Sequence, residues 1–208
     1  MLTQIDGPLL AEAFPSRHRP NSVRGSEAAA HLLTARQWTE RFAVRVEDQS
    51  VLIPARLHFA SELPPLDRTN DAWRFARALQ TRSNDGFQRQ RAARDLLNDL
   101  EPWGAPFIVA LIGEYIVQIL DDIAAALTPE NAQTLGSYIA QNSGYWQTTK
   151  RRVTSYWNVY YRSELASGSR PKWARDFRPL FKKNEYVGFR LIERLEAAAF
   201  GRGQTAGA

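Results

Sequence analysis

The chain has 208 residues, of which 44% are hydrophobic and 24% are charged, and its formal net charge is +5. This composition is typical of one ordinary folded domain and argues against global disorder. The chain contains no cysteine, which excludes disulfides, thiolate zinc sites and cysteine nucleophiles and favours a cytoplasmic location.

Residues 1–25 contain three prolines and little periodicity, which predicts an irregular arm. Asp6 and Glu12 interrupt the region where an export signal needs an apolar run, so we expect no such signal. A single, mainly helical domain is expected over residues 26–208, beginning with a helix that Ser26 caps.

Two runs of alternating residues predict a β-hairpin over about residues 39–59. In the first run, Phe42, Val44 and Val46 occupy alternate positions, and the second run repeats this pattern after the polar connection at 47–50. An isolated hairpin is marginally stable in water, so we expect this one to pack against the helices.

The periodicity then becomes helical and predicts six helices with short connections, which should pack as antiparallel helical hairpins. The third helix is apolar nearly all round in its first two turns, so we expect it to be central. Its apolar run stops at Glu114, well short of the roughly 20 residues that a membrane span requires. The predicted helices cover residues 69–82, 86–100, 104–127, 129–142, 144–163 and 185–199, and an irregular basic segment lies between 168 and 184.

The stretch from Thr81 to Leu97, TRSNDGFQRQRAARDLL, resembles the loop and second helix of a HEAT repeat. The residues at matching places are Asp85, Arg89, Ala92, Ala93, Leu96 and Leu97. This resemblance implies helical-repeat packing. The expected fold class is therefore mainly α, with antiparallel helical hairpins in a HEAT-like arrangement or an irregular bundle, and one N-terminal β-hairpin.

Arg89 shares a helix face with Ala93 and Leu96, which predicts a partly buried guanidinium that needs an acidic partner. Two acids are candidates for this structural ion pair: Asp85, four residues earlier, and Glu114 from the following helix. The alternative is an exposed Arg89 at the start of its helix.

Charge is segregated along the chain. Residues 95–149 contain seven carboxylates and no Lys or Arg, whereas residues 150–208 contain 13 Lys and Arg against 5 Asp and Glu. The basic third either docks on the acidic block or forms an exposed patch for phosphates or an acidic protein. The residues of the predicted binding surface are Lys150, Arg151, Arg162, Lys172, Arg175, Lys182 and Lys183.

The helix at 144–163 is rich in aromatic residues, and a helical wheel centred on Val153 separates its rings from most of its cations. Arg151 and Arg162 lie on the opposite side of the wheel. This favours rings that pack in the core over a stacking platform for single-stranded nucleic acid, which needs rings and cations on one exposed face. The residues on the apolar side are Trp146, Thr149, Tyr156, Trp157 and Tyr160.

No pattern of catalytic chemistry is present. The histidines His18, His31 and His58 are scattered without a second ligand at helical spacing, and the Gly-rich phosphate loops and the hydrolase nucleophile elbow are missing. We therefore predict no catalytic residue, metal or cofactor.

These patterns favour a non-catalytic helical interaction module that binds a protein partner. The alternative is a nucleic-acid-binding protein that uses the basic C-terminal residues. A third hypothesis is an enzyme similar to the HEAT-like DNA glycosylases, which rests on fold class and on the presence of Trp, Arg and Asp alone.

Overall fold

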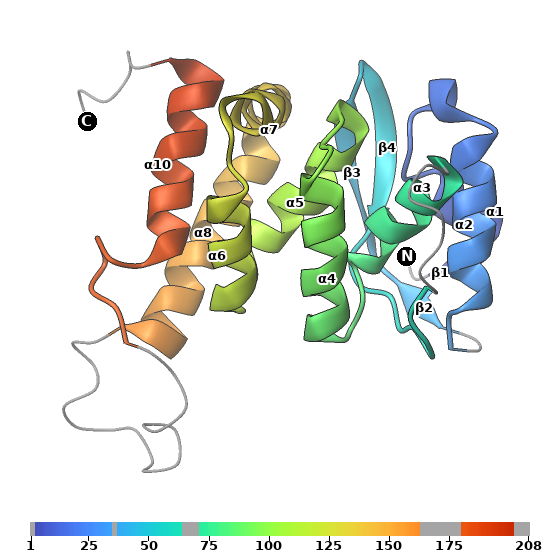
Figure 1. Ribbon diagram of the computed structural model, residues 1–208, viewed down its shortest axis with the longest axis horizontal. Coiled ribbons are helices and arrows are strands. Elements are labelled where there is room, and N and C mark those ends of the chain that lie inside the picture. Colours follow the sequence, from blue (N-terminus) through green and yellow to red (C-terminus); the bar gives the residue numbers. More distant parts are fainter. Residues whose placement is uncertain (1–2, 35–36, 64–70, 163–179, 202–208) are drawn as a thin grey trace, which may run out of the picture.

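The computed structural model describes residues 3–34, 37–63, 71–162 and 180–201. The fold is mainly helical with an N-terminal β-hairpin, as the periodicity predicts. Figure 1 shows α1, α2 and α3 at one end of the long axis together with the hairpin, and α7, α8 and α10 at the other end. The helices α4 and α5 lie near the middle of the molecule, and α6 lies beside α10.

Residues 1–25 contain more regular structure than the sequence predicts. Strand β1 (Thr3–Gln4) pairs antiparallel with β2 (Trp38–Thr39), and helix α1 (Gly7–Ala11) is followed by a 3-10 turn at Ser16–His18 and by α2 (Asn21–His31). Helix α2 therefore begins five residues before the predicted start at Ser26. The prolines precede or begin these elements, where a missing amide hydrogen costs little.

The predicted hairpin is present as β3 (Arg41–Val46) and β4 (Gln49–Pro54). Its turn is tighter than predicted, because only Glu47 and Asp48 separate the strands, both with positive φ values of 51° and 64°. Such mirror-image turns match the twist of a two-stranded ribbon. Strand β4 ends at Pro54 rather than near residue 59, because beyond Ala55 the chain leaves β3 and Leu57 and Phe59 pair with Ser83 and Leu33 instead.

Two helices connect the hairpin to the rest of the fold: α3 (Asp71–Gln80), which packs on α2, and α4 (Gly86–Leu97), which packs on α3. Helices α2 and α3 approach closely at Gly25, where a Cβ atom would lie 2.4 Å from the Ala72 carbonyl oxygen. Glycine is required at this contact because any side chain would collide with the backbone of α3.

The single helix predicted over residues 104–127 is broken in two. A 3-10 turn at Pro102–Gly104 leads into α5 (Ala105–Ile112), which is buried on every side as expected, and α6 (Val117–Ala125) follows after a non-helical junction. The Tyr161 hydroxyl donates a hydrogen bond to the Tyr115 carbonyl in this junction. In a continuous helix the Tyr115 carbonyl would accept from the amide four residues later in the chain. The Tyr161 hydroxyl replaces that donor, so the break leaves this carbonyl with a hydrogen bond.

The C-terminal half consists of α7 (Pro129–Gln141), α8 (Ser143–Tyr156) and α10 (Val187–Phe200), and α10 packs against α6 and α7. A π-helical turn at Trp157–Tyr161 extends α8. A π turn shifts the helical phase, so Tyr161 is buried where a regular helix would bury Tyr160. Within the described residues, we find no helix with the length and apolarity needed to cross a bilayer.

Candidate functional site

The predicted basic surface is only partly assembled. Lys150 Nζ lies 2.6 Å from Glu196 Oε1 of α10, so its charge is neutralised within the protein. Lys182 and Lys183 are exposed and adjoin Arg162, because the backbone of Phe181 pairs with that of Arg162. Arg151 is exposed on α8 and donates to Thr148 Oγ1, and Lys172 and Arg175 lie outside the described residues.

The acidic block is neutralised mainly from another part of the chain. Five of its seven carboxylates form ion pairs with arginines of residues 56–94 rather than with the described cations of the basic third. Helix α10 packs on the block through the buried side chains of Leu191 and Leu195, and Arg194 donates to the carbonyls of Ala124 and Leu127. The five paired acids are Asp95, Asp99, Glu101, Glu114 and Asp122.

The densest charge cluster surrounds Glu114, and we call it the arginine cluster. The Glu114 carboxylate lies 3.0 Å from Arg56 Nη2, 3.5 Å from Arg82 Nη1 and 2.8 Å from Arg89 Nε. The Arg82 and Arg89 side chains are 6% and 3% exposed, and that of Glu114 is 8% exposed. The structure therefore pairs Arg89 with Glu114, one of the two acids that the sequence offers.

Asp85, the other candidate partner, has a different role. Its side chain accepts hydrogen bonds from the amides of Phe87 and Gln88 and caps the start of α4. Capping satisfies amides that have no partner inside the helix and stabilises the helix start by roughly 1 kcal/mol.

The arginine cluster holds more positive than negative charge, because three guanidinium groups share one carboxylate. Burial lowers the pKa of Arg82 and of Arg89, while the Glu114 carboxylate acts in the opposite direction. Backbone carbonyls of Pro54, Ala55, Ser83 and Asn84 accept hydrogen bonds from these two side chains. These contacts satisfy donors but add no negative charge, so a surplus of two positive charges remains.

A surface of aromatic side chains lies beside the arginine cluster, and we call Phe87, Tyr115, Tyr156 and Tyr160 the aromatic surface. The three tyrosine rings contact one another with centroids 5.8–6.0 Å apart. Phe87 is 73% exposed and Tyr115 is 44% exposed. Phe87 follows Gly86, which packs against the Ile116 side chain, and this places the start of α4 next to the α5–α6 junction.

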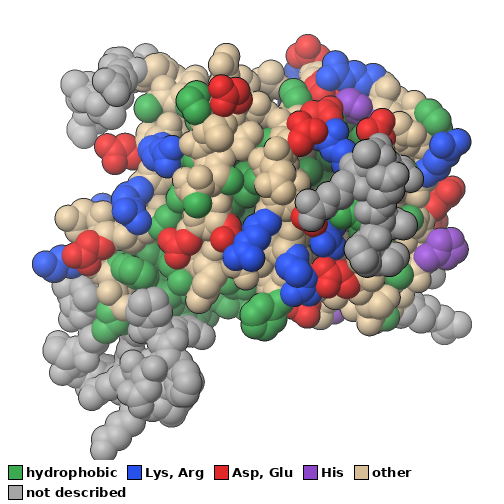
Figure 2. Space-filling view, in the orientation of Figure 1, with side chains coloured by type: hydrophobic (Ala, Val, Ile, Leu, Met, Phe, Trp, Pro, Cys, Tyr) green, Lys and Arg blue, Asp and Glu red, His purple; other side chains and the backbone are tan. Residues whose placement is uncertain are grey.

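Figure 2 shows hydrophobic side chains along the lower edge of the molecule, where Figure 1 places the starts of α4 and α6 and the end of α8. Sequence reasoning assigned Tyr156 and Tyr160 to the core, because the wheel assumed a regular helix to residue 163. The π turn begins at Trp157 and changes the phase of Tyr160, whereas Tyr156 precedes the turn and lies at the edge of the apolar face; both rings are only half-buried. No periodic signal marks Phe87 or Tyr115 as exposed.

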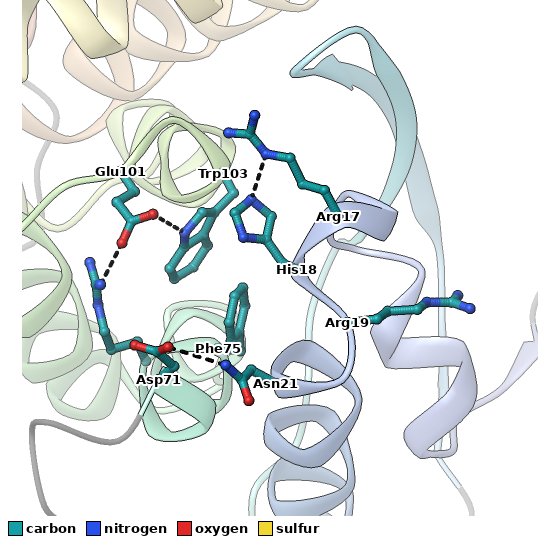
Figure 3. A pocket seen from close by; sticks show the side chains of 9 residues that line it. Arg17, His18, Arg19, Asn21, Asp71, Phe75, Glu101 and Trp103 are labelled. Atoms are coloured by element: carbon teal, nitrogen blue, oxygen red, sulfur yellow. Dashed lines mark hydrogen bonds and ion pairs between the residues drawn. The ribbon is translucent and has the colours of Figure 1, made fainter.

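A separate polar cavity of about 160 Å³ lies between the N-terminal segment and the start of α3. Figure 3 shows His18, Phe75 and Trp103 grouped on one side of it and Asp71 bonded to Asn21 on the other. This volume is smaller than the roughly 300–1,000 Å³ of sites for drug-sized ligands, so the cavity suits only a small polar molecule or water.

His18 is held in this cavity by the hairpin turn. Its Nε2 lies 2.9 Å from Glu47 Oε2 and 3.3 Å from Arg17 Nε, and Arg17 also forms an ion pair with Glu47. Nε2 either donates to Glu47 or accepts from Arg17 Nε, so the tautomer of His18 decides which of the two contacts is its hydrogen bond. Two charged groups of the cavity wall, Arg17 and Arg74, form ion pairs within the protein.

Metal chemistry is not supported by the side chains that the structure places, since no three His, Asp or Glu residues gather as potential ligands in the described ranges. Comparisons with protein-family models, curated proteins and solved structures gave no match to this chain. HEAT-like packing therefore stays a prediction from residues 81–97, and the function is argued from the geometry.

Proposed function

We propose that this protein is a non-catalytic helical module that binds an acidic segment of a protein partner through the aromatic surface. The observation that carries the proposal is the exposure of Phe87 and Tyr115 beside the half-buried rings of Tyr156 and Tyr160. Tyrosine, phenylalanine and arginine are enriched in protein interfaces, because aromatic rings bury a large area and lose little conformational freedom.

Charge complementarity supports an acidic partner. Arg56 and Arg152 are both accessible to solvent next to the aromatic surface, and the arginine cluster behind them has a surplus of two positive charges. A partner that presents carboxylates around an apolar residue would bury the rings and reduce this surplus. Complementary charges also accelerate association and exclude basic competitors.

Site-specific photo-crosslinking in cells tests the proposal. A photoreactive phenylalanine analogue at position 87 is expected to give one discrete protein adduct, which disappears when Tyr115 and Tyr156 are both replaced by serine. The matched control is the same analogue at Phe200, which is 48% exposed at the far end of α10. Equal adducts at both positions, or an adduct that survives the tyrosine substitutions, would refute a specific interface.

Nucleic-acid binding is the second candidate, and one observation favours it. The rings of Tyr115 and Tyr156 share an exposed region with Arg152, an arrangement that a single-strand stacking platform requires. It predicts that a single-stranded oligonucleotide shifts in a mobility assay at low salt and that affinity falls steeply as salt rises. A shift that Tyr156→Ala leaves unchanged would argue against a stacking role.

A further inference from the structure

The arginine cluster ends at a solvent-facing edge whose hydrogen-bond donors are not all used. Arg56 bonds to Glu114 and to the Ser83 carbonyl, yet its side chain is 36% exposed. Arg152 lies over the α5–α6 junction, since a Cβ atom on Gly113 would be 3.3 Å from its Cδ. Its guanidinium is exposed and makes no hydrogen bond or ion pair with a described residue.

The Tyr145 hydroxyl lies deeper than this edge. It is buried and has no hydrogen-bond partner among the described residues, although its ring stacks on Phe42 of β3. Burial raises the pKa of Tyr145, whereas the charges of Arg82 and Arg152 lower it. A hydroxyl without solvent access cannot bond to an incoming ligand, so the two arginines supply the donors of this edge.

We propose that Arg56 and Arg152, which we call the arginine edge, bind a carboxylate side chain of the partner. This inference rests on the proposed function and names the anchor of the partner segment. A carboxylate accepts several hydrogen bonds through two oxygens, and guanidinium groups are its favoured donors. It also brings the negative charge that the surplus around Glu114 favours.

The position of the arginine edge explains why one segment could use both surfaces. Glu114 is bonded to Arg56, and the next residue, Tyr115, contributes a ring to the aromatic surface. On α8, Arg152 precedes Tyr156 by four residues, and positions four apart lie on the same helix face. A partner with an acidic residue next to an apolar one would therefore place its carboxylate and its apolar group on adjacent sites.

The test uses the full chain and two small probes, the N-acetyl N-methylamide of glutamate and that of glutamine, at constant ionic strength and neutral pH. Arginine side-chain Nε–H signals are followed by NMR during each titration. The glutamate probe is expected to shift the Arg56 and Arg152 signals saturably in roughly the millimolar range, and the glutamine probe is not.

Matched variants localise the effect. Arg152→Gln is expected to lower the affinity for the glutamate probe by about three- to fivefold, because it removes one exposed ion pair. Arg151→Gln, which removes a neighbouring exposed cation, should leave the affinity for the glutamate probe unchanged. Equal binding of both probes, no saturable shift, or a much tighter response to inorganic phosphate would overturn the carboxylate assignment.

The two proposals fail in different ways. If the protein adduct at position 87 forms but the glutamate probe does not bind, the aromatic surface is an interface without a carboxylate anchor. If the probe binds and no adduct forms, the arginine edge is a small-carboxylate site and the proposed interaction module is refuted.

Discussion

Replacement of Glu114 by glutamine is expected to destabilise the protein strongly. Glutamine has nearly the size of glutamate but no charge, so three guanidinium groups would remain around an uncharged amide. The surplus of positive charge would rise from two to three in a region where Arg82 and Arg89 are almost fully buried. Removal of one partner from a buried ion pair costs about 3–5 kcal/mol, and we expect a loss of about this size.

Urea unfolding at pH 7, followed by far-ultraviolet circular dichroism, measures this loss as a lower midpoint at an unchanged slope. Thermal unfolding gives a second measure. For a chain of this length, about 1 kcal/mol corresponds to about 2–4 °C, so the melting temperature should fall by about 6–20 °C. Glu114→Asp keeps the charge and shortens the side chain, so it should lose clearly less than Glu114→Gln.

Asp122→Asn is the matched control for removal of a carboxylate. Asp122 pairs with Arg94 at 2.8 Å, but the Arg94 side chain is 57% exposed. Solvent screens such a pair, so its loss should cost much less stability than the loss of the Glu114 charge. If Glu114→Gln loses no more stability than Asp122→Asn, the argument that burial makes the arginine cluster costly to perturb is wrong.

Three further substitutions test other contacts by urea unfolding. Tyr161→Phe removes the hydrogen bond to a carbonyl in the α5–α6 junction and should cost about 1 kcal/mol; no loss would mean that water replaces the hydroxyl. Hydrogen bonds from Arg91 hold the pKa of Glu62 below its ordinary value, so its ionised form stabilises the fold at neutral pH. Glu62→Gln should therefore be less stable at pH 7, by up to about 1 kcal/mol, and the difference should shrink as the pH falls below 4.5; a constant gap would contradict this. Gly25→Ala should destabilise the protein by about 1–3 kcal/mol, because its Cβ would clash with α3. Gly144→Ala is the control: no atom lies within 4 Å of its new Cβ, so it should be neutral or slightly stabilising. Similar effects at both sites would refute the close approach of α2 and α3.

The parts of the fold that follow from local sequence were predictable. The alternation at Phe42, Val44 and Val46 indicates a strand, and the apolar run after Gly104 indicates a buried helix, because each pattern repeats with the period of its own backbone. The cap of α4 at Asp85 also depends on neighbouring residues only.

The break between α5 and α6 could not be read in the same way. The apolar period continues from Ile112 to Ile119 across the break, so a single helix satisfies the pattern equally well. What separates the helices in space is a set of distant contacts, in which the Glu114 carboxylate meets Arg56 and the Tyr115 carbonyl meets the Tyr161 hydroxyl.

The candidate site shows the same division. Sequence alone supplied the residue types, the separation of acidic and basic segments and the choice of Asp85 or Glu114 for Arg89. It placed the binding surface on the cations after residue 149, because charge along a chain is visible whereas its position in space is not. The tertiary structure instead pairs most acids of the block with arginines that precede them.

The sequence by itself determined the class of the protein: a mainly helical fold with a hairpin and no cysteine chemistry, because local apolar periodicity and composition are properties of neighbouring residues. Only the tertiary structure decided that three arginines converge on Glu114 and that Tyr115 and Tyr156 meet at the surface. These contacts join residues 25 or more positions apart, and their energies depend on burial, which exists only once the helices have packed.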